Sequence, residues 1–536
     1  MELAVLDRYL VVPINPSVGN KKILFYGEDG EIAFDFVAPV DAFRPKYDSF
    51  IPVERFIGRT FHVKIEPEAE LCCSFAPSLP ADDPEMSRRP LVHYTVRRGW
   101  LSDPNGLFWY GGIWHMFYQY NPTSTRWGGS LHWGHAVSSD LVRWEERDPV
   151  LFPDEDGEIF SGSAFVDSEN ASGFGFSPAG DPPILLFYTA AGGVSEQSRG
   201  KRFTQCLAVS LDGGKTFCKY GKNPVLDTGG RENRDPKVVW AEELGRYVMA
   251  LYMESDEYAL YTSSDLLDWK PLQRLTLAQE SECPDFYPLP GEDGKRLWVF
   301  SGGEDRYTVG KLTPDGFVPI QSARPHHHGS RCSYAGQTFA FPDEVKSGGT
   351  KTRRVRLTYD KMHMPDSPFE NQIGIPTDMS LVKTGDIYRL RSWPVPEIET
   401  LWRETTEKTD LRLRDGEEFI LPLSRCAYDI FIESKQGAFD VTVFGVTLFV
   451  DPAENRIVVT SPYSDDYDMP MSYGDGQVHL RVVIDMAGVE IFADRGLVYS
   501  SAEVTADFGM SYIRLRTDTG ARIDYVRAHA LASVYA

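Results

Sequence analysis

The sequence lacks a long apolar run. Nowhere do eighteen apolar residues follow one another, which is about the length that a membrane-spanning helix needs. The first ten residues include Glu2, Asp7 and Arg8, where an export signal would need an uninterrupted apolar segment. We therefore expect a chain with no membrane partner that is cytoplasmic, or secreted only if a leader has been removed.

Cysteine and basic residues are also scarce. The seven cysteines among 536 residues are scattered and show no paired CxxC spacing, which argues against a zinc site or a disulfide scaffold and for reduced thiols. The sequence has 55 Lys and Arg residues and 78 Asp and Glu residues, which gives a formal net charge of −23. Such a charge repels phosphate backbones and anionic lipids, so we expect no nucleic acid partner.

Helical periodicity is scarce as well, and short β-type runs divided by turn residues take its place. At this length the chain is expected to hold two or three domains. Residues 1–75 are predicted to form a small β module, and the Pro-rich, polar segment 76–90 a linker. Residues 405–536 read as alternating strands with frequent turns, which predicts a C-terminal β-sandwich.

A repeated unit marks residues 91–398. Three times, two β-type runs are followed by a polar turn that ends in an aromatic residue. The turn aspartates, Asp140, Asp212 and Asp265, are 72 and 53 residues apart, roughly the length of a four-stranded propeller blade with variable loops. The pattern favours an all-β fold built on a five-bladed β-propeller, and the alternative is a generic β-sandwich with similar turns.

Aromatic residues are dense between Trp100 and Pro122. Two aromatic-rich runs flank the Gly111-Gly112 pair, which predicts a β-hairpin. The preceding tetrapeptide, Asp-Pro-Asn-Gly at 103–106, could be a simple type I turn. An acid beside Trp100 and an aromatic hairpin is instead typical of a wall that stacks on a sugar ring.

Three acids stand out in the repeat region. Asp103 and Asp235 each precede a proline, and Glu282 precedes Cys283. Proline keeps the preceding residue extended, so we expect both aspartates at strand ends that point into the central funnel. Two carboxylates that face each other are the minimal equipment for glycoside hydrolysis, although any one of these acids alone could be a turn former or a surface charge.

Seven motifs follow one another along the chain. They are Trp-Leu-Ser-Asp-Pro-Asn-Gly at 100–106, Phe-Tyr-Gln-Tyr-Asn-Pro at 117–122, Trp-Gly-His-Ala-Val-Ser at 133–138, Phe-Ser-Gly-Ser-Ala at 160–164, Arg-Asp-Pro at 234–236, Glu-Cys at 282–283 and Tyr-Ala-Gly-Gln-Thr-Phe at 334–339. Together they resemble glycoside hydrolase family 32, the β-fructosidases, which include invertases, exo-inulinases and levanases. The similarity covers residues 91–400 and extends to 478–494, and residues 1–75 resemble, more weakly, a module found before some bacterial members.

The resemblance implies release of terminal β-D-fructofuranosyl units from sucrose, fructo-oligosaccharides or fructans, with retention of configuration and without a cofactor. It implies that Asp103 is the nucleophile, Glu282 the general acid/base and Asp235 the transition-state stabiliser. Contacts to the substrate are expected from Ser102, Gln119, Trp127, Phe160, Ser161, Arg234, Cys283 and Tyr334. The partner is then a small or polymeric fructoside, and a homo-oligomer is left open.

This chemistry sets requirements on the two reacting acids. Asp103 must be ionised, so we expect hydrogen bonds to keep its pKa low, and Glu282 must hold a proton, so we expect nearby charge and desolvation to raise its pKa. Retention predicts carboxyl groups about 5 to 5.5 Å apart. Cys283 is interpreted as a packed thiol beside the acid.

The sequence departs from the family pattern at Ser102, where Asn is usual, and at Tyr359, where Trp is common. The histidines at 326–328 cannot all face one way on a strand and lack carboxylates at metal spacing, so we expect a polar rim near the substrate channel and no metal. Alternatives to hydrolysis are a fructotransferase or anhydride-forming enzyme, a propeller that binds fructan without cleaving it, and an inverting pentose-releasing hydrolase.

Overall fold

The computed structural model describes residues 1–80, 89–329, 332–341, 353–424, 427–461, 464–471, 477–504 and 511–535. Residues 81–88 of the predicted linker and Cys426 lie outside these ranges. Regular structure in the described ranges is strand, apart from short 3-10 helices at Glu54–Phe56, Pro396–Leu401 and Asp494–Gly496. No helix in this part of the chain is long and apolar enough to cross a membrane. The predicted all-β class is confirmed.

The N-terminal residues form two small sheets that share one core. Their orders are β1-β6-β3-β4 and β5-β2-β7. Alternate residues of β2 and β4 are buried, as expected for strands with one face on a core. Phe25 stacks on Phe34 with ring centroids 3.9 Å apart. The strands are β1 (Glu2–Ala4), β2 (Tyr9–Ile14), β3 (Lys21–Tyr26), β4 (Ile32–Ala38), β5 (Tyr47–Pro52), β6 (Thr60–Glu66) and β7 (Ser74–Ala76).

Five antiparallel sheets follow and close into a ring. Their first strands, β8, β12, β16, β20 and β25, contact one another in that order, and β25 returns to β8. The first blade consists of β8 (Gly99–Tyr110), β9 (Ile113–Asn121), β10 (His132–Ser138) and β11 (Glu145–Leu151), with β27 (Phe369–Glu370) parallel to β8. The second blade consists of β12 (Glu158–Val166), β13 (Ile184–Ala191), β14 (Phe203–Ser210) and β15 (Cys218–Lys219). The predicted five-bladed propeller is confirmed.

The remaining blades have the same up-and-down order, in which the first strand lies innermost. The third blade holds β16 (Arg234–Ala241), β17 (Arg246–Glu254), β18 (Glu257–Ser263) and β19 (Lys270–Thr276), and the fourth holds β20 (Asp285–Pro288), β21 (Trp298–Ser301), β22 (Arg306–Thr313), β23 (Gly316–Pro319) and β24 (Arg324–Pro325). The fifth holds β25 (Ser333–Thr338), β26 (Arg354–Asp360), β28 (Gln372–Ile373), β29 (Thr377–Thr384) and β30 (Ile387–Pro394).

The repeated turn of the sequence has a single place in this architecture. Asp140, Asp212 and Asp265 each follow the third strand of a blade, where each carboxylate accepts a hydrogen bond from the serine two residues before it. Each also accepts backbone N–H groups of the turn, which is the usual role of Asp in tight turns. The repeat therefore marks blade architecture and rules out the generic sandwich for this region.

The C-terminal residues form two six-stranded sheets packed face to face, which confirms the predicted β-sandwich. One sheet has the order β31 (Trp402–Leu413), β42 (Ala521–Leu531), β33 (Ala427–Gln436), β38 (Val478–Ile484), β39 (Gly488–Ala493) and β40 (Val498–Glu503). The other has the order β32 (Glu418–Pro422), β41 (Tyr512–Arg516), β34 (Phe439–Val443), β35 (Val446–Asp451), β36 (Arg456–Ser461) and β37 (Ser464–Pro470).

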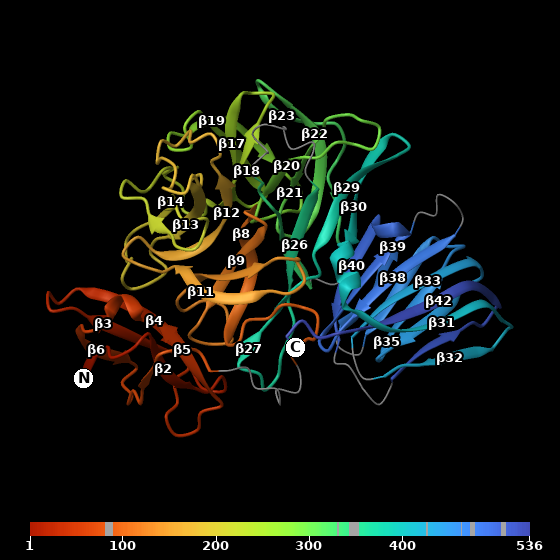
Figure 1. Ribbon diagram of the computed structural model, residues 1–536, viewed down its shortest axis with the longest axis horizontal. Helices are drawn as coiled ribbons and strands as arrows, with labels where there is room; N and C mark the ends of the chain where they lie inside the picture. The colour runs from red at the N-terminus through yellow and green to blue at the C-terminus, as the bar shows by residue number, and fades with distance from the viewer. Residues whose placement is uncertain are drawn as a thin grey trace.

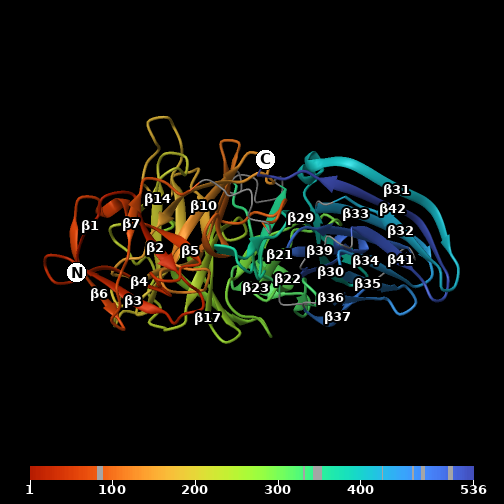
Figure 2. The ribbon, with the colours of Figure 1, turned by 90° about the horizontal axis from the view of Figure 1, so that it is seen from below.

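The propeller lies between the other two parts of the chain (Figure 1; Figure 2). The propeller and the sandwich share a core that includes Ile398 and Phe492. Inside this interface His93 lies between Asp485 and Glu490, at 3.0 Å from each carboxylate, and all three side chains are buried. Burial lowers the pKa of His93, but the hydrogen bonds and charges of the two carboxylates outweigh it and raise the pKa to about 10. An imidazolium therefore joins the two domains.

Candidate active site

The inner strands of four blades break register at the residues that the motifs single out. The breaks lie between Leu101 and Pro104 in β8, Phe160 and Gly162 in β12, Arg234 and Lys237 in β16, and Tyr334 and Gln337 in β25. A bulge inserts an unpaired residue and re-aims its side chain. Asp103 lies inside β8, so the prediction that it lies at a strand end is wrong. A bulge releases it from the hydrogen bonds between β8 and β9 without ending the strand.

One pocket, of about 120 Å³, collects the residues of these inner strands. All eleven predicted site residues line it: Ser102, Asp103, Gln119, Trp127, Phe160, Ser161, Arg234, Asp235, Glu282, Cys283 and Tyr334. Trp100, Leu131 and Tyr359 complete the lining. Leu131 was not predicted, since an isolated leucine just before a strand carries no chemical signal.

Asp103 is held at the bottom of this pocket by two neighbours. The Ser161 hydroxyl donates a hydrogen bond to Oδ2 at 2.6 Å, and the Cys283 thiol lies 3.5 Å from the same oxygen. Burial raises the pKa of Asp103 above its usual value, and the charge of Glu282 adds to the rise, whereas the Ser161 hydrogen bond opposes it. The expectation of a low pKa is therefore wrong, because desolvation outweighs the hydrogen bonds.

Asp235 is the most deeply buried of the three acids, with 6% of its surface exposed. Its Oδ2 accepts the backbone N–H of Cys283 at 3.0 Å and lies 4.0 Å from Nε of Arg234. Burial raises the pKa of Asp235 to about 7, although the Arg234 guanidinium acts to lower it. This carboxyl is therefore poised to exchange a proton near neutral pH.

Glu282 reaches the pocket from the loop before β20. Its Oε1 accepts from Nη2 of Arg234 at 2.7 Å, and its Oε2 accepts from the Tyr334 hydroxyl at 2.5 Å. Burial and nearby carboxylates hold the pKa of Tyr334 well above its usual range, so the phenol remains a donor. The Glu282 side chain is 36% exposed, which leaves it open to a ligand that enters the pocket.

Cys283 packs between the acids as predicted. Its thiol lies 3.7 Å from Oδ2 of Asp235 as well as beside Asp103. Burial and the three surrounding carboxylates raise the pKa of Cys283 well above its usual value. The group is therefore a neutral thiol and not a nucleophile.

The backbone is strained where the acids are presented. Asp235, Glu282 and Cys283 have φ angles of +65°, +53° and +38°, in a region that residues with a side chain rarely occupy. Such conformations persist only where the surrounding structure imposes them, and they cluster at functional sites. The strain at these positions is an indication of function that is independent of the motifs.

The mouth of the pocket is aromatic. Trp127 is 64% exposed, and its ring lies edge-on to Phe160 at 6.4 Å. Gln119 lies deeper: its Nε2 donates to the backbone oxygen of Ile159 at 2.9 Å, while its Oε1 is buried without a hydrogen-bond partner among the described residues. An acceptor in this state is available to a ligand hydroxyl.

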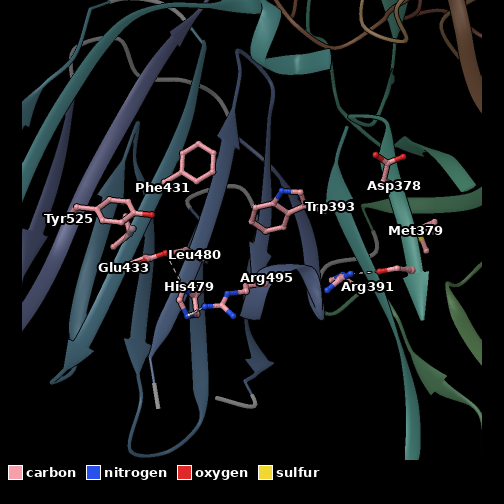
Figure 3. A pocket seen from close by; sticks show the side chains of 12 residues that line it. Asp378, Met379, Arg391, Trp393, Phe431, Glu433, His479, Leu480, Arg495 and Tyr525 are labelled. Carbon is pink, nitrogen blue, oxygen red and sulfur yellow. Dashed lines mark hydrogen bonds and ion pairs between the residues drawn. The ribbon is translucent and has the colours of Figure 1, made fainter. Parts of the chain in front are cut away.

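A larger pocket, of about 540 Å³, lies between the propeller and the sandwich, but its acids are already paired. Asp378 accepts two hydrogen bonds from Arg353 at 2.6 and 2.9 Å, and Glu433 pairs with His479 at 3.1 Å. Figure 3 shows Asp378 and Glu433 far apart, with Trp393 between them in the view. No two free carboxylates face each other there among the drawn residues, so we assign the chemistry to the smaller pocket.

Two groups of residues that include histidine lie outside the lining of the smaller pocket. His326 is buried and contacts the Ser392 hydroxyl at 2.7 Å, and His327 accepts the backbone N–H of Ser501 at 3.0 Å. The prediction of a polar rim is wrong, because these rings pack between the propeller and the sandwich. His93, Asp360 and Glu490 bring ligand atoms within 4.8 Å of one another, but both nitrogens of His93 already bond carboxylates.

Comparisons with known proteins agree on one group. The family described as "Glycosyl hydrolases family 32 N-terminal domain" matches residues 93–394. A levanase of Bacillus subtilis (strain 168) is 31% identical over 493 residues, which cover 83% of this chain and 71% of the levanase. Invertase 2 of Saccharomyces cerevisiae is 36% identical over 441 residues, which cover 77% of this chain and 79% of the invertase.

A solved structure has a similar fold. The crystal structure of an exo-inulinase from Aspergillus awamori superposes with a TM-score of 0.74 at 24% identity, over 85% of this chain and 100% of the inulinase. At this identity the match supports the architecture of the propeller and sandwich.

Proposed function

Since the chain belongs to glycoside hydrolase family 32, we propose that it is a retaining β-fructosidase, which releases terminal β-D-fructofuranosyl units from sucrose, fructo-oligosaccharides or fructans. One observation carries the proposal: three carboxyl groups from three different blades open into one small pocket. A closed ring of sheets suits a ligand that enters end-on, which favours attack on the terminal unit of a chain.

In the first step the Asp103 carboxylate attacks the anomeric carbon C2 of the fructosyl unit. The bond from C2 to the glycosidic oxygen breaks with its electron pair, and Glu282 transfers a proton to that oxygen so that a neutral alcohol leaves. A covalent fructosyl ester on Asp103 results. The hydrogen bond from Ser161 supports the ionised form of Asp103 that this attack requires.

In the second step water replaces the leaving alcohol. Glu282, now ionised, removes a proton from the water, and the hydroxide oxygen attacks C2 from the side opposite Asp103. The ester bond breaks and Asp103 regains its charge. Two displacements at C2 retain its configuration.

Asp235 and Arg234 are proposed to hold the fructose ring. The Asp235 carboxyl accepts hydrogen bonds from ring hydroxyls, which strengthen as positive charge develops on the ring in the transition state. Arg234 fixes Glu282 through its hydrogen bonds to Oε1. The buried acceptor Oε1 of Gln119 is offered to a further hydroxyl.

The test is to incubate the protein with sucrose, inulin and levan and to follow released fructose. We expect Asp103→Asn to lower kcat about 10⁴-fold or more on every substrate. Glu282→Gln should lower kcat on sucrose by about 10² to 10⁴, since its proton is missing, while the first step on 4-nitrophenyl β-D-fructofuranoside, whose leaving group needs no proton, stays near wild type.

Undiminished hydrolysis of sucrose by either variant would contradict the assignment. Products that are oligosaccharides or cyclic difructose instead of free fructose would favour transfer over hydrolysis. Binding of fructan without any turnover by the wild-type protein would favour a binding propeller.

A further inference from the structure

The loop that carries Trp127 has little structure of its own. Residues 122–131 connect β9 to β10 without regular secondary structure. The buried side chain of Asn121, the last residue of β9, donates to the backbone oxygen of Arg126 at 2.7 Å and accepts the N–H of Thr123 at 2.9 Å. The indole of Trp127 extends from this loop over the pocket mouth, where it is largely exposed.

The outer side of the same loop is held by the N-terminal module. The Ser49 hydroxyl, which is buried, donates to the backbone oxygen of Thr123 at 3.0 Å. The Tyr47 hydroxyl accepts the N–H of Thr125 and contacts its Oγ1, both at 3.1 Å. Both hydroxyl groups come from β5, and Figure 1 shows the module (red) against the blade that contains β9 and β11.

Strand β4 holds the loop from a second side. The N–H of Val37 donates to the backbone oxygen of Gly129 at 2.7 Å, and the oxygen of Val37 accepts from the Thr123 hydroxyl at 3.0 Å. Gly129 has a φ of +101°, and a Cβ there would lie 2.5 Å from the oxygen of Val37. Only glycine permits so close an approach of the two backbones, so the module and loop fit each other on both sides of Trp127.

A neighbouring loop of the second blade is attached to the module as well. The Asp35 carboxylate accepts the N–H groups of Glu196 and Gln197 at 3.0 and 3.3 Å. The Gln197 side chain donates to the backbone oxygen of Ala33 at 2.9 Å. The module is thus fixed to two blades, and it can act as a rigid support for the 122–131 loop of the first blade.

We propose that the N-terminal module is a positioning element of the active site, which holds Trp127 in place to stack on the sugar that follows the terminal fructose. The inference rests on the proposed function, because it assigns a leaving-group contact to that same pocket. The acids bind the terminal unit at the bottom, and Trp127 at the mouth meets the next unit. A loop that is already ordered loses less conformational entropy on binding, so the module lowers KM for oligosaccharides and leaves kcat unchanged.

The experiment uses the full chain with the double variant Tyr47→Phe and Ser49→Ala, which touches the loop but not the pocket. We expect KM for a fructosyl trisaccharide to rise about 5- to 10-fold, the effect of one or two lost hydrogen bonds, with kcat unchanged. KM for methyl β-D-fructofuranoside, whose leaving group is too small to reach Trp127, should stay at the wild-type value. Tyr26→Phe, a matched change on strand β3 of the same module, should alter neither.

Two further measurements separate positioning from a general loss of stability. In a Trp127→Ala background the double variant should add nothing to KM, since there is no ring left to place. Amide hydrogen exchange in residues 122–131 should become about 10-fold faster in the double variant and stay unchanged in Tyr26→Phe.

An unchanged KM for the trisaccharide, additive effects with Trp127→Ala, or unchanged exchange in the loop would each overturn the proposal. These outcomes differ from failure of the proposed function. If the wild-type protein does not hydrolyse sucrose or methyl β-D-fructofuranoside, the fructosidase assignment fails, and hydrogen exchange still decides whether the module orders the loop.

Discussion

Burial at the bottom of the pocket governs the chemistry of individual residues. Asp103 and Asp235 both have raised pKa values, and desolvation is the largest cause for each. Hydrogen bonds from Ser161 and from the backbone of Cys283 act in the opposite direction. The ionised form of Asp103 is therefore maintained by a few specific donors against burial and the nearby charge of Glu282.

The Ser161 hydrogen bond gives a pH-dependent prediction. It stabilises the ionised form of Asp103, so its removal in Ser161→Ala raises the pKa of Asp103 further. The acidic limb of the kcat/KM profile should then move to higher pH by about one unit. Ser161→Thr, which keeps the hydroxyl, should leave the limb in place, and an acidic limb that stays put or moves to lower pH in Ser161→Ala would contradict this account.

The residues of the pocket could be predicted from the sequence better than their electrostatics. The eleven predicted side chains line one pocket because linear motifs preserve residue types around each acid. The predicted direction of the Asp103 pKa shift was wrong, because the depth of burial is a tertiary property. The buried place of His326 was missed for the same reason, since its neighbour Ser392 is far away in the sequence.

At the scale of elements, bulges in the inner strands turn side chains of the propeller into the pocket. A regular strand would alternate its side chains between the two faces of a blade. The bulges in β8, β12, β16 and β25 interrupt this alternation at the pocket. Acids that are far apart in the sequence therefore point to a common centre.

Gly162 provides a test of the bulge in β12. A Cβ at this position would lie 1.9 Å from the backbone oxygen of Phe187 on β13, so Gly162→Ala must push the strands apart and displace Ser161. We expect kcat/KM to fall about 10²-fold and the free energy of unfolding to fall by about 1 to 3 kcal/mol. Gly221→Ala, where a Cβ meets nothing within 4 Å, should change neither activity nor stability, and an active Gly162→Ala protein would argue against the role of the bulge.

The strands and the repeated Asp turns could be predicted from the sequence, whereas the bulges could not. Alternating apolar runs and a Ser and an Asp two residues apart are local signals, as at Ser138 and Asp140. A bulge depends on the register against a partner strand, which a single sequence does not reveal. The predicted hairpin at Gly111 and Gly112 is confirmed, because that turn is encoded in two adjacent residues with positive φ.

At the scale of the whole molecule, the propeller is supported on two sides. The N-terminal module contacts the loop that carries Trp127, and the sandwich contacts the propeller through the buried charges around His93. Neither contact has a local sequence signal, because each joins residues that are far apart along the chain. The order of the parts was predictable from composition and periodicity, but their contacts were not.

The His93 network predicts a pH-dependent link between the propeller and the sandwich. Its pKa of about 10 exceeds the unfolded value of 6.5, so its contribution to stability is complete below pH 6.5 and is lost as pH rises towards 10. His93→Ala leaves two carboxylates without their cation and should lower the free energy of unfolding by about 3 to 5 kcal/mol at pH 6.

Urea denaturation at several pH values measures this effect. The difference between the wild-type protein and His93→Ala should shrink as pH rises from 7 to 10. His62→Ala is the control, because His62 is exposed on the N-terminal module. A difference that is constant or grows with pH would contradict the assignment of an imidazolium at this interface.

The central claim is that Asp103 and Glu282 act in succession on one fructosyl unit with retention. Its most direct test is to run the reaction with methanol as an acceptor and to identify the methyl fructoside by NMR, since this product cannot change its anomeric form in solution. Attack through a fructosyl ester on Asp103 predicts methyl β-D-fructofuranoside. Methyl α-D-fructofuranoside would show a single displacement at C2 and would contradict the account.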